Sequence, residues 1–177
     1  GGKPNIGETV LYKLLYFIDF DNFELYGRPI TGMKYLKLQF GPVPKFSEYN
    51  KVVEQMEKSR ELEIIENEYH GMKQKRYVAL VDADKNNLLE EEKNIISIVI
   101  SKYSDFNAKT IENFVHGDAP WKETRDKDII NYNLVYNRVP PYANRDYEFE
   151  FMQAGASDIN NSFPPLSKEE YDYYENL

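Results

Sequence analysis

Two histidines, His70 and His116, are the side chains in this sequence best suited to proton transfer. Asp118 follows His116 closely, and a His–Asp pair could act as general acid and base. No nucleophile motif accompanies them, and neither histidine has a second histidine, a cysteine or clustered carboxylates at metal-ligand spacing. The common phosphate-, dinucleotide- and hydrolase-site patterns do not occur. We therefore expect no catalytic residue, metal or cofactor, and interpret His116 as a residue at a helix C-terminus that interacts with the helix dipole.

Asp19 is the other side chain that demands an explanation, because it lies between Ile18 and Phe20 in the most apolar stretch of the chain. A buried carboxylate without a partner is costly. Arg28 lies just beyond the same stretch, so we expect a structural ion pair between the two; a partner-binding acid is the alternative.

The charge is unevenly distributed along the sequence. The net charge is −8, and the residues from Tyr142 onward carry eight acidic and two basic residues, which is −6 of that total. This balance argues against direct nucleic-acid binding by the domain, since such binding needs basic surface. No apolar run reaches the ~20 residues of a membrane span. The absence of cysteine fits a cytoplasmic protein.

The apolar patterns predict an α+β fold, mainly helical, around a central apolar helix, with a small antiparallel β-hairpin and an acidic C-terminal extension. The central helix is expected over residues 6–26, with Asn5 and Glu8 as a capping box and Gly27 after its end. Residues 30–40 are expected to be extended and 41–44 an irregular corner, with Pro44 opening a helix to residue 59. A hairpin (62–65 and 76–80) and helices at 88–103 (capping box Asn87–Glu90) and 107–116 follow, then a turn opened by Pro120.

Three regions follow from this pattern. Residues 1–5 are expected to be a disordered start that includes a cloning scar at Gly1-Gly2. Residues 6–141 form the domain, with Pro140-Pro141 at its boundary. Residues 142–177 form an acidic, tyrosine-rich arm whose Ser167–Glu170 capping box opens a short helix. A helix this short is marginal alone and needs a docking surface, on its own domain or on a partner.

Four motifs occur together: KLLYFIDF (13–20), YGRPITG (26–32), KLQFGPVP (37–44) and VHGDAPWK (115–122). In this order and spacing, over about residues 8–135, the sequence resembles the Panacea, or SocA-like antitoxin, domain. The resemblance implies an antitoxin of a phage-associated toxin–antitoxin system that neutralises a cognate protein toxin by direct contact. It implies no enzyme. The alternatives are an adaptor that delivers the toxin to a cellular protease, a DNA-binding regulator that uses residues 88–116 and, least favoured, an enzyme that uses His116 and Asp118.

The motif residues are expected mainly to build the shared scaffold, and the partner is expected to bind elsewhere. The scaffold set is Lys13, Tyr16, Asp19, Arg28, Pro29, Gly41, Pro42, Pro44, His116, Pro120 and Trp121. The expected partner-binding set is Tyr69, His70, His116, Trp121, Tyr142, Tyr147, Tyr171 and Tyr174. The arm is expected to cover the toxin or to pack on its own domain, with a slight preference for the first.

Overall fold

The computed structural model describes residues 3–145 and confirms the predicted α+β class, with helices and two small antiparallel two-stranded sheets. The acidic extension lies outside the described residues. The helices are α1 (Glu8–Tyr26), α2 (Phe46–Lys58), α3 (Glu90–Tyr103), α4 (Ala108–Val115), α5 (Ala119–Glu123) and the 3-10 helix η1 (Tyr132–Asn137). The strands are β1 (Tyr35–Leu38), β2 (Gly41–Pro44), β3 (Leu62–Tyr69) and β4 (Met72–Ala79).

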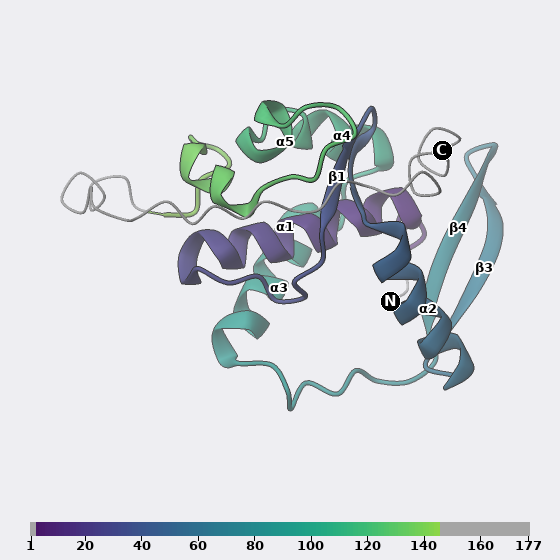
Figure 1. Cartoon of the computed structure of the whole chain (residues 1–177). Coiled ribbons are helices and arrows are strands. Elements are labelled where there is room, and N and C mark those ends of the chain that lie inside the picture. Colours follow the sequence, from purple (N-terminus) through teal and green to yellow (C-terminus); the bar gives the residue numbers. More distant parts are fainter. Residues whose placement is uncertain (1–2, 146–177) are drawn as a thin grey trace.

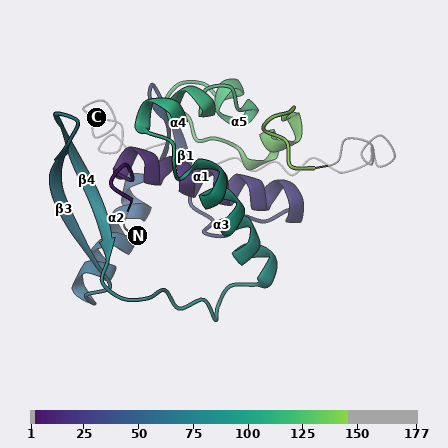
Figure 2. The ribbon, with the colours of Figure 1, turned by 180° about the vertical axis from the view of Figure 1, so that it is seen from behind.

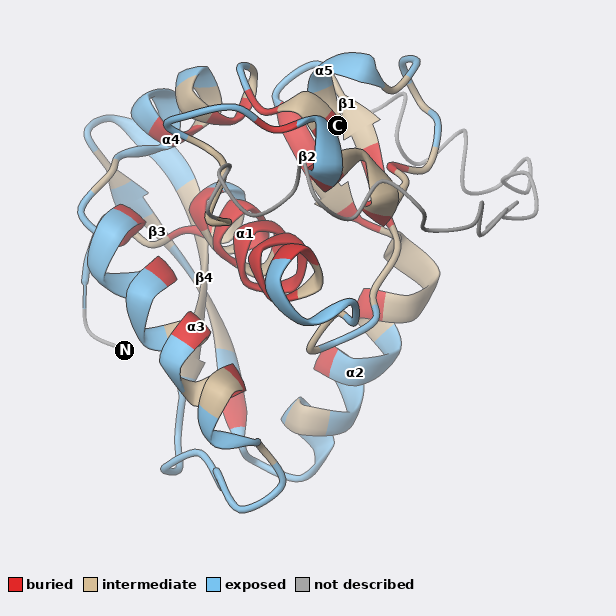
Figure 3. Cartoon of the chain, turned by 90° about the vertical axis from the view of Figure 1, so that its left-hand side faces the viewer, coloured by how far each residue is buried: buried red, intermediate tan, exposed pale blue. Residues whose placement is uncertain are grey.

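Helix α1 is the centre of the domain, as its apolar sequence predicts. It packs against α3 and α4, against β2 and β4, and against η1, so it is covered on several sides (Figures 1 and 3). Its aromatic residues contact rings of α3, α4 and η1 in stacked or tilted pairs; Phe17, for example, stacks on Tyr103 with ring centroids 4.6 Å apart. Such pairs add to the stabilisation from buried apolar area. Gly27 ends α1 in the left-handed conformation that glycine favours.

The segment Gly41–Pro44 is a strand, and the prediction of an irregular corner is wrong. Strand β2 pairs with β1 across a tight turn at residues 39–40, with Lys37 opposite Pro42 and Tyr35 opposite Pro44. Leu38 and Gly41 flank the turn and form a hydrogen-bonded pair. Hydrogen-bonded and non-hydrogen-bonded pairs alternate along an antiparallel ladder, so both prolines fall at non-hydrogen-bonded positions, where no backbone N–H is needed. The other edge of β1 bonds residues 127–130. The next helix begins at Phe46 with Lys45 as N-cap, so Pro44 does not open it.

The second hairpin, β3–β4, is longer than the sequence predicts. It turns at His70-Gly71, where both residues have positive φ, and it packs with α2 on a second, smaller apolar cluster around Tyr12 and Tyr49. Figures 1 and 2 both show this hairpin beside the N-terminal end of α1, joined to α3 by the long connection 80–89.

Two predicted helix caps are wrong. Gly7 is the N-cap of α1, and Asn5 instead donates to the carbonyls of Ser104 and Phe106 at the α3–α4 turn. Helix α3 begins at Glu90 after Leu89, whose backbone N–H donates to the Glu92 carboxylate. Helix α4 does begin after a conventional cap, because the Asn107 side chain accepts from the Thr110 N–H at 2.8 Å. The third predicted capping box, at 167–170, lies outside the described residues.

The described residues that follow Pro141 are hydrogen-bonded to the domain. The Tyr142 hydroxyl donates to the Phe114 carbonyl at 3.0 Å, and Asn144 donates to Glu24 from its backbone and its side chain. Among the described helices, none has the length and apolar content that a membrane crossing requires.

Candidate partner-binding surface

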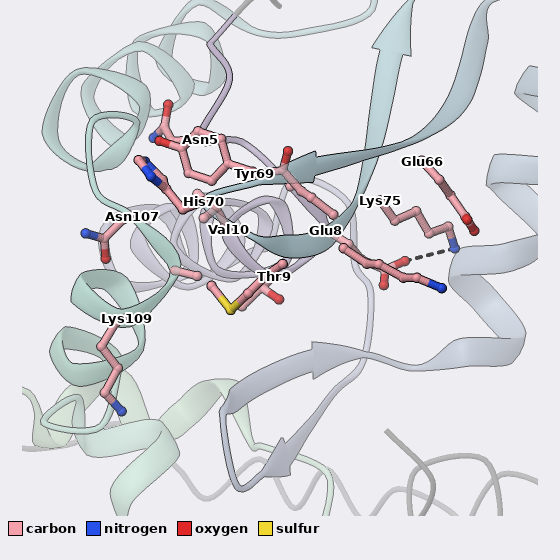
Figure 4. Close-up of a pocket in the computed structure, with 15 residues that line it drawn as sticks. Asn5, Glu8, Thr9, Val10, Glu66, Tyr69, His70, Lys75, Asn107 and Lys109 are labelled. Atoms are coloured by element: carbon pink, nitrogen blue, oxygen red, sulfur yellow. Dashed lines mark ion pairs between the residues drawn. The ribbon is translucent and has the colours of Figure 1, made fainter.

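A groove opens between the N-terminal end of α1, the tip of the β3–β4 hairpin and the N-terminal end of α4. Its volume is about 700 Å³, which lies within the range of roughly 300–1,000 Å³ typical of ligand sites. Tyr69 and His70 lie on the hairpin side and Asn107 and Lys109 on the α4 side, with Val10 of α1 between them (Figure 4). The groove therefore brings together two of the residues predicted to contact a partner.

The hairpin tip presents an aromatic pair to this groove. The rings of Tyr69 and His70 meet edge to face with centroids 4.3 Å apart, and Met72 beside them is 68% exposed. Lys75 is paired with Glu8 of α1 at 3.0 Å (Figure 4), which joins the hairpin to the helix. The tip is thus an exposed apolar and aromatic edge on an anchored hairpin.

The charged lining of the groove contains both lysines and glutamates, which are Lys73, Lys75, Lys109, Glu8 and Glu66. Lys75 is paired with Glu8, and Lys109 is paired with Glu112 at 2.8 Å. The N-termini of α1 and α4 also border the groove, and no side chain caps α1 at Gly7. The unpaired N–H groups of a helix's first turn carry a partial positive charge. The groove therefore combines apolar walls with a rim of mixed charge.

His116 and Trp121 lie together at the other end of α4. Their rings stack with centroids 4.2 Å apart and planes 17° from parallel, and Lys37 Nζ lies 4.4 Å from the Trp121 ring. Burial lowers the pKa of His116. Within residues 3–145, His116 Nε2 and Trp121 Nε1 have no hydrogen-bond partner.

Tyr142 packs on Phe114 of the same helix. The described members of the predicted partner-binding set therefore all border α4, in separate places. Tyr147, Tyr171 and Tyr174 lie outside the described residues.

Seven of the eleven motif residues are buried, and four are not. Arg28 is exposed and pairs with Glu91 at 3.0 Å, and Pro29 is half-buried. His116 and Trp121 are also half-buried. The fully buried motif residues are Lys13, Tyr16, Asp19, Gly41, Pro42, Pro44 and Pro120.

Asp19 does not pair with Arg28, so that expectation is wrong. Its carboxylate accepts from the Thr31 backbone N–H at 2.6 Å, from the Thr31 hydroxyl, and from the Tyr35 hydroxyl at 2.7 Å. Burial raises the pKa of Asp19, and the hydrogen bonds from Thr31 partly offset that rise. Asp19 therefore fixes the loop after α1 to the helix by neutral donors, and it has no ion pair with a cation in the described part of the chain.

A buried ionic cluster, absent from the sequence-based expectations, joins α1 to Asp118 and Arg138. The Arg138 guanidinium donates to both oxygens of Asp118 at 2.8 and 2.7 Å, and also to Asp21 at 2.8 Å and Glu24 at 2.9 Å. The Tyr16 hydroxyl donates to Asp118 at 2.9 Å. The Asp118 carboxylate is thus committed to structure, so the His116–Asp118 acid–base pair considered above does not form. Two features could have indicated the cluster: acidic residues at helical spacing in α1, and one arginine in the apolar segment 129–139.

The cluster predicts a pH-dependent stability through Asp21. Burial raises its pKa to about 6, although Arg138 lowers it in part. The folded state therefore binds a proton more readily than the unfolded state, whose aspartates titrate near 3.8. Asp21 should add about 2 kcal/mol of stability as the pH falls from ~7.5 to ~4.5. Urea unfolding at both pH values should show that gain in the parent and not in Asp21→Asn; an equal pH response in both would contradict it.

Lys13 is a second buried charge, and its ammonium has no hydrogen-bond or ion-pair partner among residues 3–145. The residue is 2% exposed, and burial lowers the pKa of its amine to about 8, against smaller opposing effects of Glu112 and Glu8. The aliphatic part of Lys13 explains why residue 41 is glycine, because φ there is +105° and a Cβ would lie 2.8 Å from Lys13 Cε.

The described residues contain no cluster of three or more histidines and carboxylates placed to hold a metal ion.

Comparison with protein families identifies the domain. The family model described as "Antitoxin SocA-like, Panacea domain" matches residues 11–122, which run from α1 to α5. The chain belongs to this family. The comparisons with curated proteins and with solved structures returned no match.

Proposed function

We propose that this chain is an antitoxin that binds a cognate protein toxin and neutralises it by direct contact in the cytoplasm. The observation that carries the proposal is the family match over residues 11–122, in which the family is described as SocA-like antitoxins. The proposal is supported by a groove of about 700 Å³ with an exposed apolar and aromatic edge at the hairpin tip.

The toxin would bind along α4 and its two neighbouring surfaces. The groove supplies Tyr69 and His70, and the opposite end of α4 supplies the stacked His116 and Trp121. Aromatic side chains that are part-buried at one end and wet at the other are enriched at interfaces. The arm residues Tyr147, Tyr171 and Tyr174 would extend this contact beyond the domain.

The test is coexpression with the product of the adjacent small reading frame, followed by purification of the complex. We expect growth arrest by that product alone, rescue by this chain, and a stoichiometric complex. Inhibition of the purified toxin without any protease would distinguish direct contact from delivery to a protease. A harmless neighbouring product, or rescue without a complex, would overturn the proposal.

Tyr69→Ala should weaken the complex substantially. An interfacial tyrosine at a hot spot contributes about 2 kcal/mol, or roughly 30-fold in Kd. Tyr26→Ala is the matched control, because Tyr26 is 44% exposed at the opposite end of α1. Titration calorimetry of both variants against the toxin should show a loss for the first only. Equal affinities would place the toxin outside the groove.

A further inference from the structure

We propose that the toxin places a carboxylate beside the β1–β2 turn, where it pairs with the ammonium of Lys13. Lys13 is 2% exposed, and its ammonium has no hydrogen-bond or ion-pair partner among residues 3–145. A buried charge is costly unless it is paired. The lysine therefore lacks the anion that a bound protein would supply. The pairing rests on the proposed function, because the carboxylate belongs to the toxin.

The ammonium of Lys13 lies beneath an exposed turn. A Cβ placed on Gly41 would lie 2.8 Å from Lys13 Cε, 3.5 Å from Lys13 Nζ and 3.0 Å from Val115 Cγ1. The side chain thus ends where β2 meets α4. Phe40, at the turn, is 53% exposed, and Gln39 is exposed beside it. Gly41 has no side chain to stand between the ammonium and the turn, and a lysine stem is flexible enough to bring its charged end to the surface.

The acidic residues that act on Lys13 are already paired with other lysines. Glu112 and Glu8 raise the pKa of the Lys13 amine, against the larger lowering by burial. Glu112 pairs with Lys109 at 2.8 Å, and Glu8 pairs with Lys75 at 3.0 Å. Neither glutamate lies within ion-pair distance of Lys13. One unpaired positive charge matches a carboxylate better than a phosphate monoester, which carries about 1.5 to 2 negative charges.

Two further side chains near this turn lack hydrogen-bond partners. Burial is the main cause that lowers the pKa of His116; Lys13 lowers it as well, and the Gln39 backbone raises it, so the ring lies near both. Trp121 stacks on that ring. Within residues 3–145, His116 Nε2 and Trp121 Nε1 are buried and unpaired, which is rare in folded proteins. A partner seated on this turn would supply hydrogen bonds to both rings while its carboxylate meets Lys13.

Lys13→Met tests the pairing in the complex with the product of the adjacent reading frame. We expect its affinity to fall at least about 30-fold, because removal of one partner from a buried charge pair has an effect of that size. Methionine keeps most of the packing of the stem, and urea unfolding of the free variant verifies that it is folded. Lys85→Met is the matched control, since Lys85 is exposed in the connection 80–89, on the opposite side of α1 from α4 in Figures 1 and 2. Parent-like affinity of Lys13→Met would overturn the proposal.

Proton uptake on binding is a second readout, and the parent chain alone can give it. Burial lowers the pKa of Lys13 to about 8, so about three quarters of the free amines are neutral at pH ~8.5. A nearby carboxylate favours the charged amine. The complex should therefore take up about 0.7 proton at this pH, measured by titration calorimetry in two buffers of different ionisation enthalpy. His116 does not contribute, because its pKa lies below 6.5.

The variants assign that proton to Lys13. Uptake should be absent in Lys13→Met and retained in Lys85→Met. Uptake that persists in Lys13→Met would place the proton on another group and overturn the proposal, as would a parent complex that takes up none.

The outcomes separate the pairing from the proposed function. Failure of the parent chain to form a complex would overturn both. A tight complex without proton uptake at Lys13 would leave neutralisation standing and remove only the role of this lysine. Loss of affinity together with loss of uptake in Lys13→Met would support both.

Discussion

Arg138→Met is expected to lower the free energy of unfolding by about 3–5 kcal/mol, the usual cost of removing one partner from a buried ion pair. The Arg138 side chain is fully buried among Asp21, Glu24 and Asp118. Without the guanidinium, these carboxylates would stay buried beside one another with no cation between them. A loss of this size is a large share of the ~5–15 kcal/mol by which domains are stable. Urea unfolding monitored by circular dichroism measures it.

Arg125→Met is the matched control, because Arg125 is exposed and forms no ion pair within residues 3–145. It should change stability by no more than about 0.5 kcal/mol. If Arg138→Met does not fold, Arg138→Lys keeps one charge without the paired contacts to Asp118 and should fold with an intermediate loss. A loss for Arg138→Met no larger than that of the control would show that the cluster does not hold the domain together.

Lys13→Met is expected to have the opposite effect and to stabilise the fold by about 3 kcal/mol at pH ~7.5. The lysine stem fills the space beside Gly41, and methionine can keep most of that packing. The ammonium is the costly part, since burial lowers its pKa from 10.5 to about 8. The unfolded chain therefore binds this proton more tightly than the folded chain does.

The pH dependence gives a second readout of Lys13. Stability of the parent should rise by about 2 kcal/mol between pH ~7.5 and ~9.5, as the folded amine loses its proton first. Lys13→Met should lack that rise, and Lys122→Met should retain it. A destabilised Lys13→Met would mean that the ammonium contributes to folding. A stabilised variant that fails to neutralise the toxin would show that Lys13 is kept for function at the expense of stability.

The parts of this fold that the sequence predicts well are those with local signals. The apolar length of α1, the left-handed Gly27 and the hairpin with its turn at His70-Gly71 all follow from periodicity and turn chemistry. The β1–β2 hairpin was missed because two prolines normally argue against a strand. Pro42 and Pro44 are compatible with a strand because they are two residues apart in β2, so both occupy positions that donate no hydrogen bond to β1. Only the pairing register reveals this, and the amino-acid composition of the segment does not.

The candidate site was predicted only in part, for a related reason. Tyr69 and His70 are neighbours at the turn that the sequence predicts, and both line the groove. The lysines opposite them, and the helix ends beside them, come from segments that meet only in three dimensions. The Arg138 cluster joins residues more than a hundred positions apart, and no pattern within one segment could reveal it.

The central position of α1 also determines when this protein can complete its core during synthesis. Helix α1 is made before the other described elements, but η1 and Arg138, which complete its covering, are made about 110 residues later. At ribosomal rates of roughly 5–20 residues per second, part of its apolar surface stays uncovered for about 6–20 s. A nascent chain that stops anywhere before Arg138 leaves an aromatic helix exposed and carboxylates unpaired. Such truncated products should be substrates for chaperones and proteases, while the released chain that includes Arg138 is not.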